Sequence, residues 1–167
     1  GGMGEAMSNG PDWVAATADL GRTFNTRRIT VKNHGCCGHA FAAIDGALAL
    51  KQAHGFKASD VASIRVGGYS ATVEVTGNHL HGTPAAAKFS LPFLVASALV
   101  HGSIRLDAYT PQRLADRGVG ELMETVEVVL DPEIDRLFPR QRAAKLRVEL
   151  KDGRVFEHFQ PHRVGDP

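Results

Sequence analysis

The most constraining feature of this sequence is an apolar segment at residues 85–100, in which Lys88 is the only charged residue. Thr83 and Pro84 come directly before it, and this pair is typical of a helix start. The threonine side chain can cap free backbone amides, and proline fits the first helical turn. We therefore predict one helix over Ala85–Val100. Because it is apolar on almost every side, it has to be buried against at least one further layer.

A strand pair near the end of the sequence predicts that layer. Residues 144–150 and 154–159 flank Asp152 and Gly153. Both of these turn residues tolerate positive φ, which is typical of a β-hairpin.

Further elements follow from periodicity and turn signals. β-branched or alternating runs predict strands at 24–32, 61–69 and 126–130. Helical spacing and caps predict helices at 11–20, 39–53, 110–115 and 120–125, and His54-Gly55 closes the second of these. Gly67 and Gly68 suggest a bulge or a close approach. Together these patterns predict one α+β domain: a mixed or antiparallel sheet with a C-terminal hairpin and helices packed against it.

Composition excludes several function classes. The 167 residues are 43% hydrophobic, which is enough for the core of one domain. The net charge of +1 gives no broad attraction to nucleic acid or to a membrane surface. No apolar run is long enough to span a bilayer, and no signal peptide is apparent. We expect a cytoplasmic protein without nucleic-acid or membrane partners.

The densest reactive cluster is residues 32–39, where a predicted strand meets a predicted helix. Free amides at a helix start, together with Lys32, would favour a carboxylate or phosphate. The same field would lower the pKa of a thiol at Cys36 or Cys37. The alternative is that the cysteines are small buried side chains and that Lys32 is solvated.

Other candidate residues carry weaker signals. The histidines and cysteines of the cluster are zinc-type ligands, but adjacent cysteines fit one tetrahedral site poorly, so we predict no metal. Lys88 could reach outward to solvent or bind an anion. The hairpin region is rich in basic residues, which usually form a solvated face: Arg140, Arg142, Lys145, Arg147, Lys151 and Arg154.

Three segments resemble the MmgE/PrpD family: Lys32–Cys37, Ala42–Leu48 and Ala87–Ala96, the last containing Lys-Phe-Ser-Leu-Pro. This family includes 2-methylcitrate dehydratases, cis-aconitate decarboxylase and an iminodisuccinate epimerase. The resemblance implies the smaller α+β lid domain of a two-domain enzyme, at residues 11–160. Residues 1–10 and 161–167 would then be connectors to a large helical domain.

The resemblance also implies roles for individual residues. Lys32 matches a lysine that contacts a substrate carboxylate. Cys37 stands where decarboxylase-like members carry a histidine, and Phe93 stands where many members carry a tyrosine. Phe41 occupies another frequent histidine position, while His39 lies two residues earlier. We predict Lys32, Cys37 and His39 as catalytic residues, and the substrate-binding set as Lys32, Cys36, Gly38, Lys88 and Phe93.

The expected function is that of a lid in a lyase or isomerase acting on a small di- or tricarboxylate such as 2-methylcitrate. No cofactor is expected. The helical domain, in the same chain or in a separate subunit, would supply much of the acid–base machinery, so the lid alone would have little activity. We also expect a homodimer. The alternative is a non-catalytic dimerisation or partner-binding module with the same fold.

Overall fold

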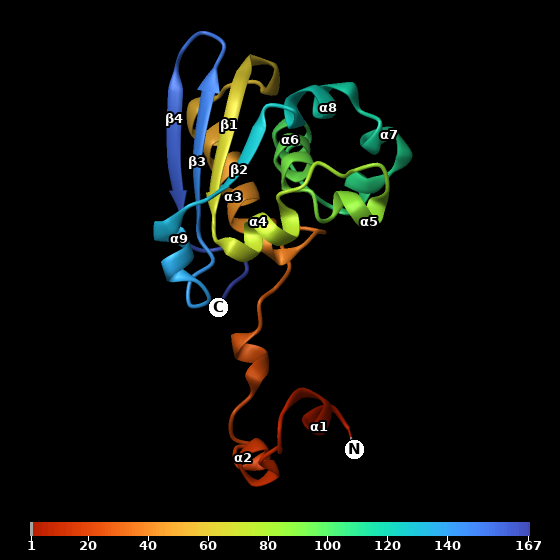
Figure 1. The fold of residues 1–167 in the computed structure, drawn as a ribbon, viewed down its shortest axis with the longest axis vertical. Helices are drawn as coiled ribbons and strands as arrows, with labels where there is room; N and C mark the ends of the chain where they lie inside the picture. Colours follow the sequence, from red (N-terminus) through yellow and green to blue (C-terminus); the bar gives the residue numbers. More distant parts are fainter. Residues whose placement is uncertain (1) are drawn as a thin grey trace. The chain divides into compact units, whose positions relative to one another are not determined.

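A computed structural model describes residues 2–167 of the protein (Figure 1). The chain divides into two compact units, one comprising residues 1–30 with Pro167 and the other Val31–Asp166. Each unit is described by itself.

The first unit holds two one-turn helices, α1 (Met3–Met7) and α2 (Trp13–Thr17), and a 3-10 turn at Asn25–Arg28. Helix α2 is shorter than the predicted helix at 11–20. The strand predicted at 24–32 is wrong, because half of that stretch is the 3-10 turn and the described residues beside it form no strand. A β-branched run becomes a strand only where a neighbouring strand satisfies its backbone groups.

The second unit is built on a four-stranded sheet with the order β2-β1-β3-β4. The strands are β1 (Val61–Gly68), β2 (Val126–Leu130), β3 (Ala144–Leu150) and β4 (Val155–Gln160). Strands β1 and β2 are parallel, whereas the other two pairs are antiparallel. The mixed sheet and the C-terminal hairpin are thus confirmed. Gly153 in the hairpin turn has φ +87°, as the turn signal required.

The two glycines at the end of β1 allow close approach and do not form a bulge. The only register shift between β1 and β3 lies between Val61 and Ser63, at the other end of the strand. A Cβ on Gly67 would lie 3.1 Å from the Asp131 side chain, and one on Gly68 would lie 2.8 Å from Thr72. Neighbouring segments therefore occupy the space that side chains would need.

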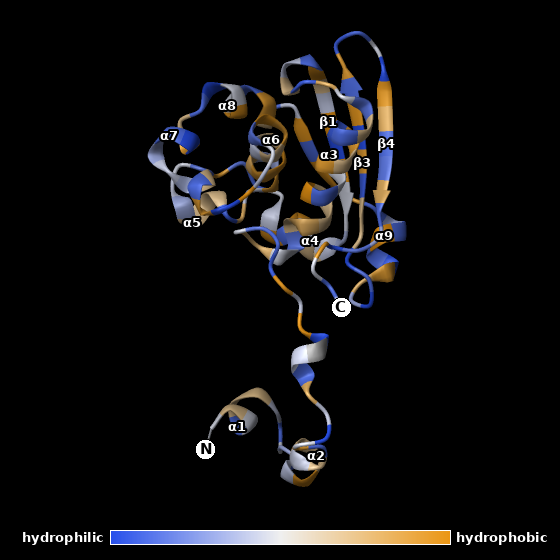
Figure 2. Ribbon diagram, turned by 180° about the vertical axis from the view of Figure 1, so that it is seen from behind, coloured by the Kyte–Doolittle hydropathy of each residue, from blue (hydrophilic) through white to orange (hydrophobic). Residues whose placement is uncertain are grey.

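Two helices, α3 (Phe41–His54) and α6 (Leu91–His101), form the hydrophobic core with the sheet. Helix α3 contacts β3 and β4, while α6 contacts α3 and β2. Figure 2 shows α6 coloured mostly as hydrophobic, in keeping with its nearly complete burial. Helix α3 ends at Gly55, whose φ of +66° is the left-handed cap that its terminal glycine predicted.

The predicted helix at 85–100 is two helices, α5 (Pro84–Ala87) and α6, which is a correction. Thr83 caps α5 as expected, accepting a hydrogen bond from the Ala86 amide at 3.2 Å. Ser90 then caps α6, where the Phe93 amide donates to its hydroxyl at 3.4 Å. A second cap and a proline at residue 92 restart the helix. Lys88 consequently lies at the break between helices.

The second unit also contains four short α-helices: α4 (Ser70–Thr76), α7 (Pro111–Leu114), α8 (Arg117–Met123) and α9 (Pro132–Leu137). Three 3-10 turns lie at Gly38–Ala40, Ala58–Asp60 and Leu106–Tyr109. Helices α7 and α8 correspond to the segments predicted at 110–115 and 120–125. Helices α4 and α9 were not predicted. Within residues 2–167, no helix has the length and apolar character needed to cross a membrane.

Candidate functional site

The reactive cluster at residues 32–39 comprises an irregular loop at 32–37 and the start of a 3-10 turn, Gly38–Ala40, that leads into α3. At its start, the Val31 amide donates to the Gly165 carbonyl at 2.8 Å. Farther along, the Arg163 guanidinium donates to the Gly38 carbonyl at 3.3 Å and pairs with Asp166 at 2.6 Å. The segment before the C-terminus therefore holds this loop at two points.

A buried polar pair fixes the middle of the loop to α3. His34 Nε2 lies 2.8 Å from Asp45 Oδ1, and both side chains are buried. The second carboxylate oxygen, Oδ2, accepts a hydrogen bond from the Val164 amide at 2.9 Å. One carboxylate thus joins the loop, the helix and the C-terminal segment, an arrangement that a buried charge requires.

The loop is also tied to the break between α5 and α6 and to the segment that follows α6. The Cys37 amide donates to the Lys88 carbonyl at 3.0 Å, and the Gly35 amide donates to the Ile104 carbonyl at 3.0 Å. The Cys37 bond places the backbone of Lys88 directly against the cysteine pair. The helix break described above is what frees the Lys88 carbonyl to accept it.

A surface pocket of about 510 Å³ opens at this junction. Five of the predicted site residues line it, together with Gly35 and Phe89: Lys32, Cys36, Cys37, Gly38 and Lys88. Lys32 Nζ lies 3.4 Å from the Cys36 carbonyl oxygen. Of the described residues, two lysines and no acidic residue line this pocket, so its charge favours an anionic ligand such as a carboxylate.

The two cysteines differ in their surroundings. Cys36 is buried, whereas Cys37 is half-buried. Burial, with a smaller contribution from the neighbouring Cys37, raises the pKa of the Cys36 thiol to about 12. For Cys36 this contradicts the prediction of a lowered pKa: desolvation outweighs the nearby Lys32 charge. Cys36 is therefore a small apolar wall of the pocket, as the alternative interpretation held.

Behind Lys88 lies Tyr109, which the sequence did not single out. Lys88 Nζ stands 5.2 Å from the centre of the Tyr109 ring, within the range of a cation–π contact. Burial raises the pKa of Tyr109, so its phenol stays protonated. Its buried hydroxyl has no hydrogen-bond partner among the described residues.

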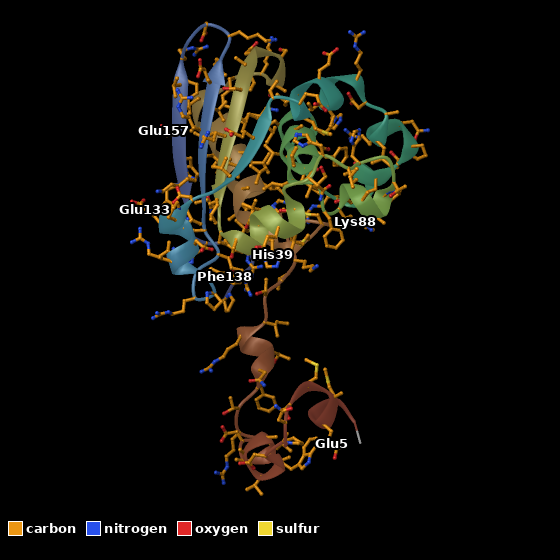
Figure 3. All side chains as sticks on the ribbon, in the orientation of Figure 1. Glu5, His39, Lys88, Glu133, Phe138 and Glu157 are labelled. Carbon is orange, nitrogen blue, oxygen red and sulfur yellow. The ribbon has the colours of Figure 1, made fainter. Side chains whose placement is uncertain are left out.

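His39 lies beside the pocket rather than in its wall. His39 Nδ1 is 2.9 Å from the hydroxyl of Tyr69, which is fully buried at the end of β1. Burial lowers the pKa of His39, and the positive charges of Arg142 and Arg163 lower it further. Figure 3 shows His39 between Phe138 and Lys88 along the lower end of the second unit. The imidazole is thus neutral near pH 7 and able to exchange protons.

Phe93 is placed in the core, away from the pocket. It is fully buried, with its ring 5.8 Å from the His81 ring in a stacked arrangement. Phe41 is also fully buried, and the Arg163 guanidinium lies 5.9 Å from its ring centre. Across residues 2–167, no group of three or more His, Cys, Asp or Glu side chains is arranged to hold a metal ion.

A comparison with protein-family models shows which family the chain belongs to. The family model described as the MmgE/PrpD C-terminal domain matches residues 34–167. No curated protein matches the chain. The matched region contains the whole pocket except Lys32, which lies two residues before it.

Proposed function

The chain belongs to the MmgE/PrpD family through its C-terminal domain, and on that premise we propose that it is the substrate-capping lid of a lyase or isomerase. The substrate would be a small di- or tricarboxylate such as 2-methylcitrate. The observation that carries this proposal is the pocket bordered by Lys32 and Lys88 and built from the Cys36–Gly38 loop.

The chemistry follows from the kind of ligand that the pocket favours. Lys32 and Lys88 hold a carboxylate, which leaves the adjacent carbon as the position where a proton is removed or added. The positive charge of the lysines beside the carboxylate stabilises the electron density that develops on it when the neighbouring proton is removed. Loss of water, loss of CO₂ or epimerisation are the possible outcomes of such proton transfer.

The remaining candidates take supporting or proton-transfer roles. His39 is a neutral imidazole beside the pocket and is the candidate acid–base group of this domain, with the half-buried Cys37 closer to the ligand. Cys36 and Gly38 shape the wall. Phe93 is a residue of α6 that packs in the core, and its ring has no hydroxyl to offer a substrate.

A helical domain would form the other wall of the site, with residues 1–10 and 161–167 as connectors. The first unit supports such a partner, because its helices α1 and α2 bury none of their residues. Large apolar side chains there are exposed, including Met3, Met7, Trp13, Val14 and Leu20. Exposed apolar side chains at this density mark a surface that another domain covers. We also propose a homodimeric, cytoplasmic enzyme.

The same exposed side chains favour a second candidate, a non-catalytic module that binds a partner or dimerises. The two candidates differ in the use of the pocket. A catalytic lid needs its lysines, whereas a binding module does not.

The test is steady-state kinetics with the chain joined to, or mixed with, the family's helical domain. The substrates are 2-methylcitrate and cis-aconitate. We expect Lys32→Ala to lower kcat/KM by about tenfold or more, the value of a lost charge-assisted contact. Lys57→Ala is the matched control, because Lys57 is an exposed lysine outside this pocket. Equal kinetics for the two variants would remove Lys32 from the site, and partner binding without turnover would favour the second candidate.

A further inference from the structure

A second cationic group lies near His39 and has no role in the pocket just described. Arg142 is half-buried, and its guanidinium carbon lies 5.9 Å from the centre of the Phe138 ring. Among the described residues, no carboxylate comes within 4.0 Å of it, unlike Arg147 and Arg163, which have acidic partners. An arginine held on an aromatic ring without an acidic partner keeps its donors available for an anion.

Phe138 brings this arginine, Tyr69 and His39 together. Tyr69 stacks on Phe138 with ring centres 4.5 Å apart and planes within 10°. The His39 ring centre is 6.4 Å from that of Phe138. Because Tyr69 is fully buried, its position is fixed by packing, and its hydroxyl at 2.9 Å from Nδ1 fixes the His39 ring in turn.

The hydrogen bond between Tyr69 and Nδ1 couples the tautomer of His39 to the phenol. Burial raises the pKa of Tyr69, so the hydroxyl retains its hydrogen. When that hydroxyl donates to Nδ1, the neutral imidazole bears its own hydrogen on Nε2. Nε2–H is then a hydrogen-bond donor on the half-buried side chain, in the neighbourhood of the Arg142 charge.

We propose that Arg142 and His39, oriented by Tyr69, form a second carboxylate-binding point beside the pocket of Lys32 and Lys88. This inference rests on the proposed function and deepens it: the lid contacts two carboxylates of one substrate and thereby selects di- and tricarboxylates over monocarboxylates. The two points are neighbours, because Gly38, which lines the pocket, directly precedes His39. Tyr69 acts as a positioning residue.

The test is NMR titration of the 167-residue chain, following the ring signals of His39, with malonate as the dicarboxylate probe and acetate as the monocarboxylate. We expect malonate to shift the His39 signals at lower concentration than acetate does. Arg142→Gln should weaken malonate binding about three- to tenfold, the effect of losing one partly exposed charge-assisted contact. Arg140→Gln is the matched control. It removes the same charge from an exposed side chain that lies two residues before Arg142 in the sequence.

Each outcome decides the inference. Equal affinity in the two arginine variants, or no response of His39 to malonate, would overturn it. A response of the Lys32 ammonium signal without one at His39 would overturn it and leave the proposed function standing. Loss of the His39 response in Arg142→Gln with unchanged kinetics in Lys32→Ala would leave a single carboxylate point at Arg142 and would overturn the two-point selection of di- and tricarboxylates. Tyr69→Phe should also shift the imidazole nitrogen signals away from the Nε2–H tautomer, and unchanged signals would exclude Tyr69 as the positioning residue.

Discussion

His34 Nε2 and Asp45 Oδ1 lie 2.8 Å apart inside the second unit, where both side chains are buried. Asp45 uses its other oxygen to accept the Val164 amide. The carboxylate therefore makes two simultaneous hydrogen bonds through different oxygens, and it holds the reactive loop and the C-terminal segment on the same helix.

We expect Asp45→Asn to lower the free energy of unfolding by about 1–3 kcal/mol, because an amide has only one acceptor oxygen and leaves one buried donor unpaired. Urea unfolding measures this loss. Asp107→Asn is the control: its exposed carboxylate pairs with Arg113 at 3.4 Å, and such surface pairs contribute less than about 1 kcal/mol. Equal losses in the two variants would contradict the role given to Asp45.

The two thiols should react at different rates. Burial raises the pKa of Cys36 to about 12, so almost none of it is thiolate at pH 8, and thiolate is the form that alkylating agents attack. We expect the Cys37→Ala variant, in which Cys36 remains, to be alkylated at least about tenfold more slowly than Cys36→Ala. Mass spectrometry of the time course measures both rates. Faster labelling at Cys36 would show that the loop opens readily.

The lowered pKa of His39 predicts a pH dependence of stability. Burial and the charges of Arg142 and Arg163 disfavour the protonated form in the folded state. As the pH falls below the ordinary histidine value of 6.5, the unfolded chain takes up this proton first, so stability is lost on acidification and is fully present above that value. Compared with the wild type, His39→Gln should lose less stability between pH 7 and about pH 5. Parallel curves for the two proteins would refute this linkage.

Helix α3 packs so closely on the sheet that Gly46 has no room for a side chain. A Cβ there would overlap Leu146 Cδ1, and Leu146 is itself held in the core. Gly46→Ala should therefore destabilise the protein by about 1–3 kcal/mol through overpacking.

Gly120→Ala is the matched control for that substitution. Gly120 also lies within a helix, α8, but a Cβ there would meet nothing within 4 Å. The gain in helix propensity should stabilise the protein by up to about 1 kcal/mol. Thermal unfolding of both variants checks the opposite signs, and a stabilising Gly46→Ala would contradict the packing described here.

The sequence predicted the elements whose signals are local. The hairpin at Gly153 and the end of α3 at Gly55 depend on a few adjacent residues, and both are confirmed. The strand predicted at 24–32 is wrong because a strand needs a partner that local sequence does not reveal. The prediction of one helix over 85–100 treats Ser90 and Pro92 as part of one apolar run. Together they are a helix-start signal, a cap followed by a proline in the first turn, and they begin α6.

The site was predicted in the same uneven way. Lys32, Cys36, Cys37 and Gly38 lie close together in sequence, and the structure places Lys88, singled out as the one charge of an apolar segment, in the same pocket. Tyr69 and Arg142 enter only as a proposal from the structure, because they are brought beside His39 and Phe138 by long-range contacts. Arg142 was grouped with solvated basic residues, since nothing in its local sequence distinguishes it from Arg140.

The hydrogen bond between Val31 and Gly165 has a consequence for protein engineering. The two ends of the second unit meet, as is common in domains that tolerate insertion into other chains. A host protein would therefore need only one surface loop, opened between neighbouring residues, to accept this unit as a graft. Such a graft would carry its pocket along intact, because the Cys36–Gly38 loop and both lysines lie between those two residues in the chain.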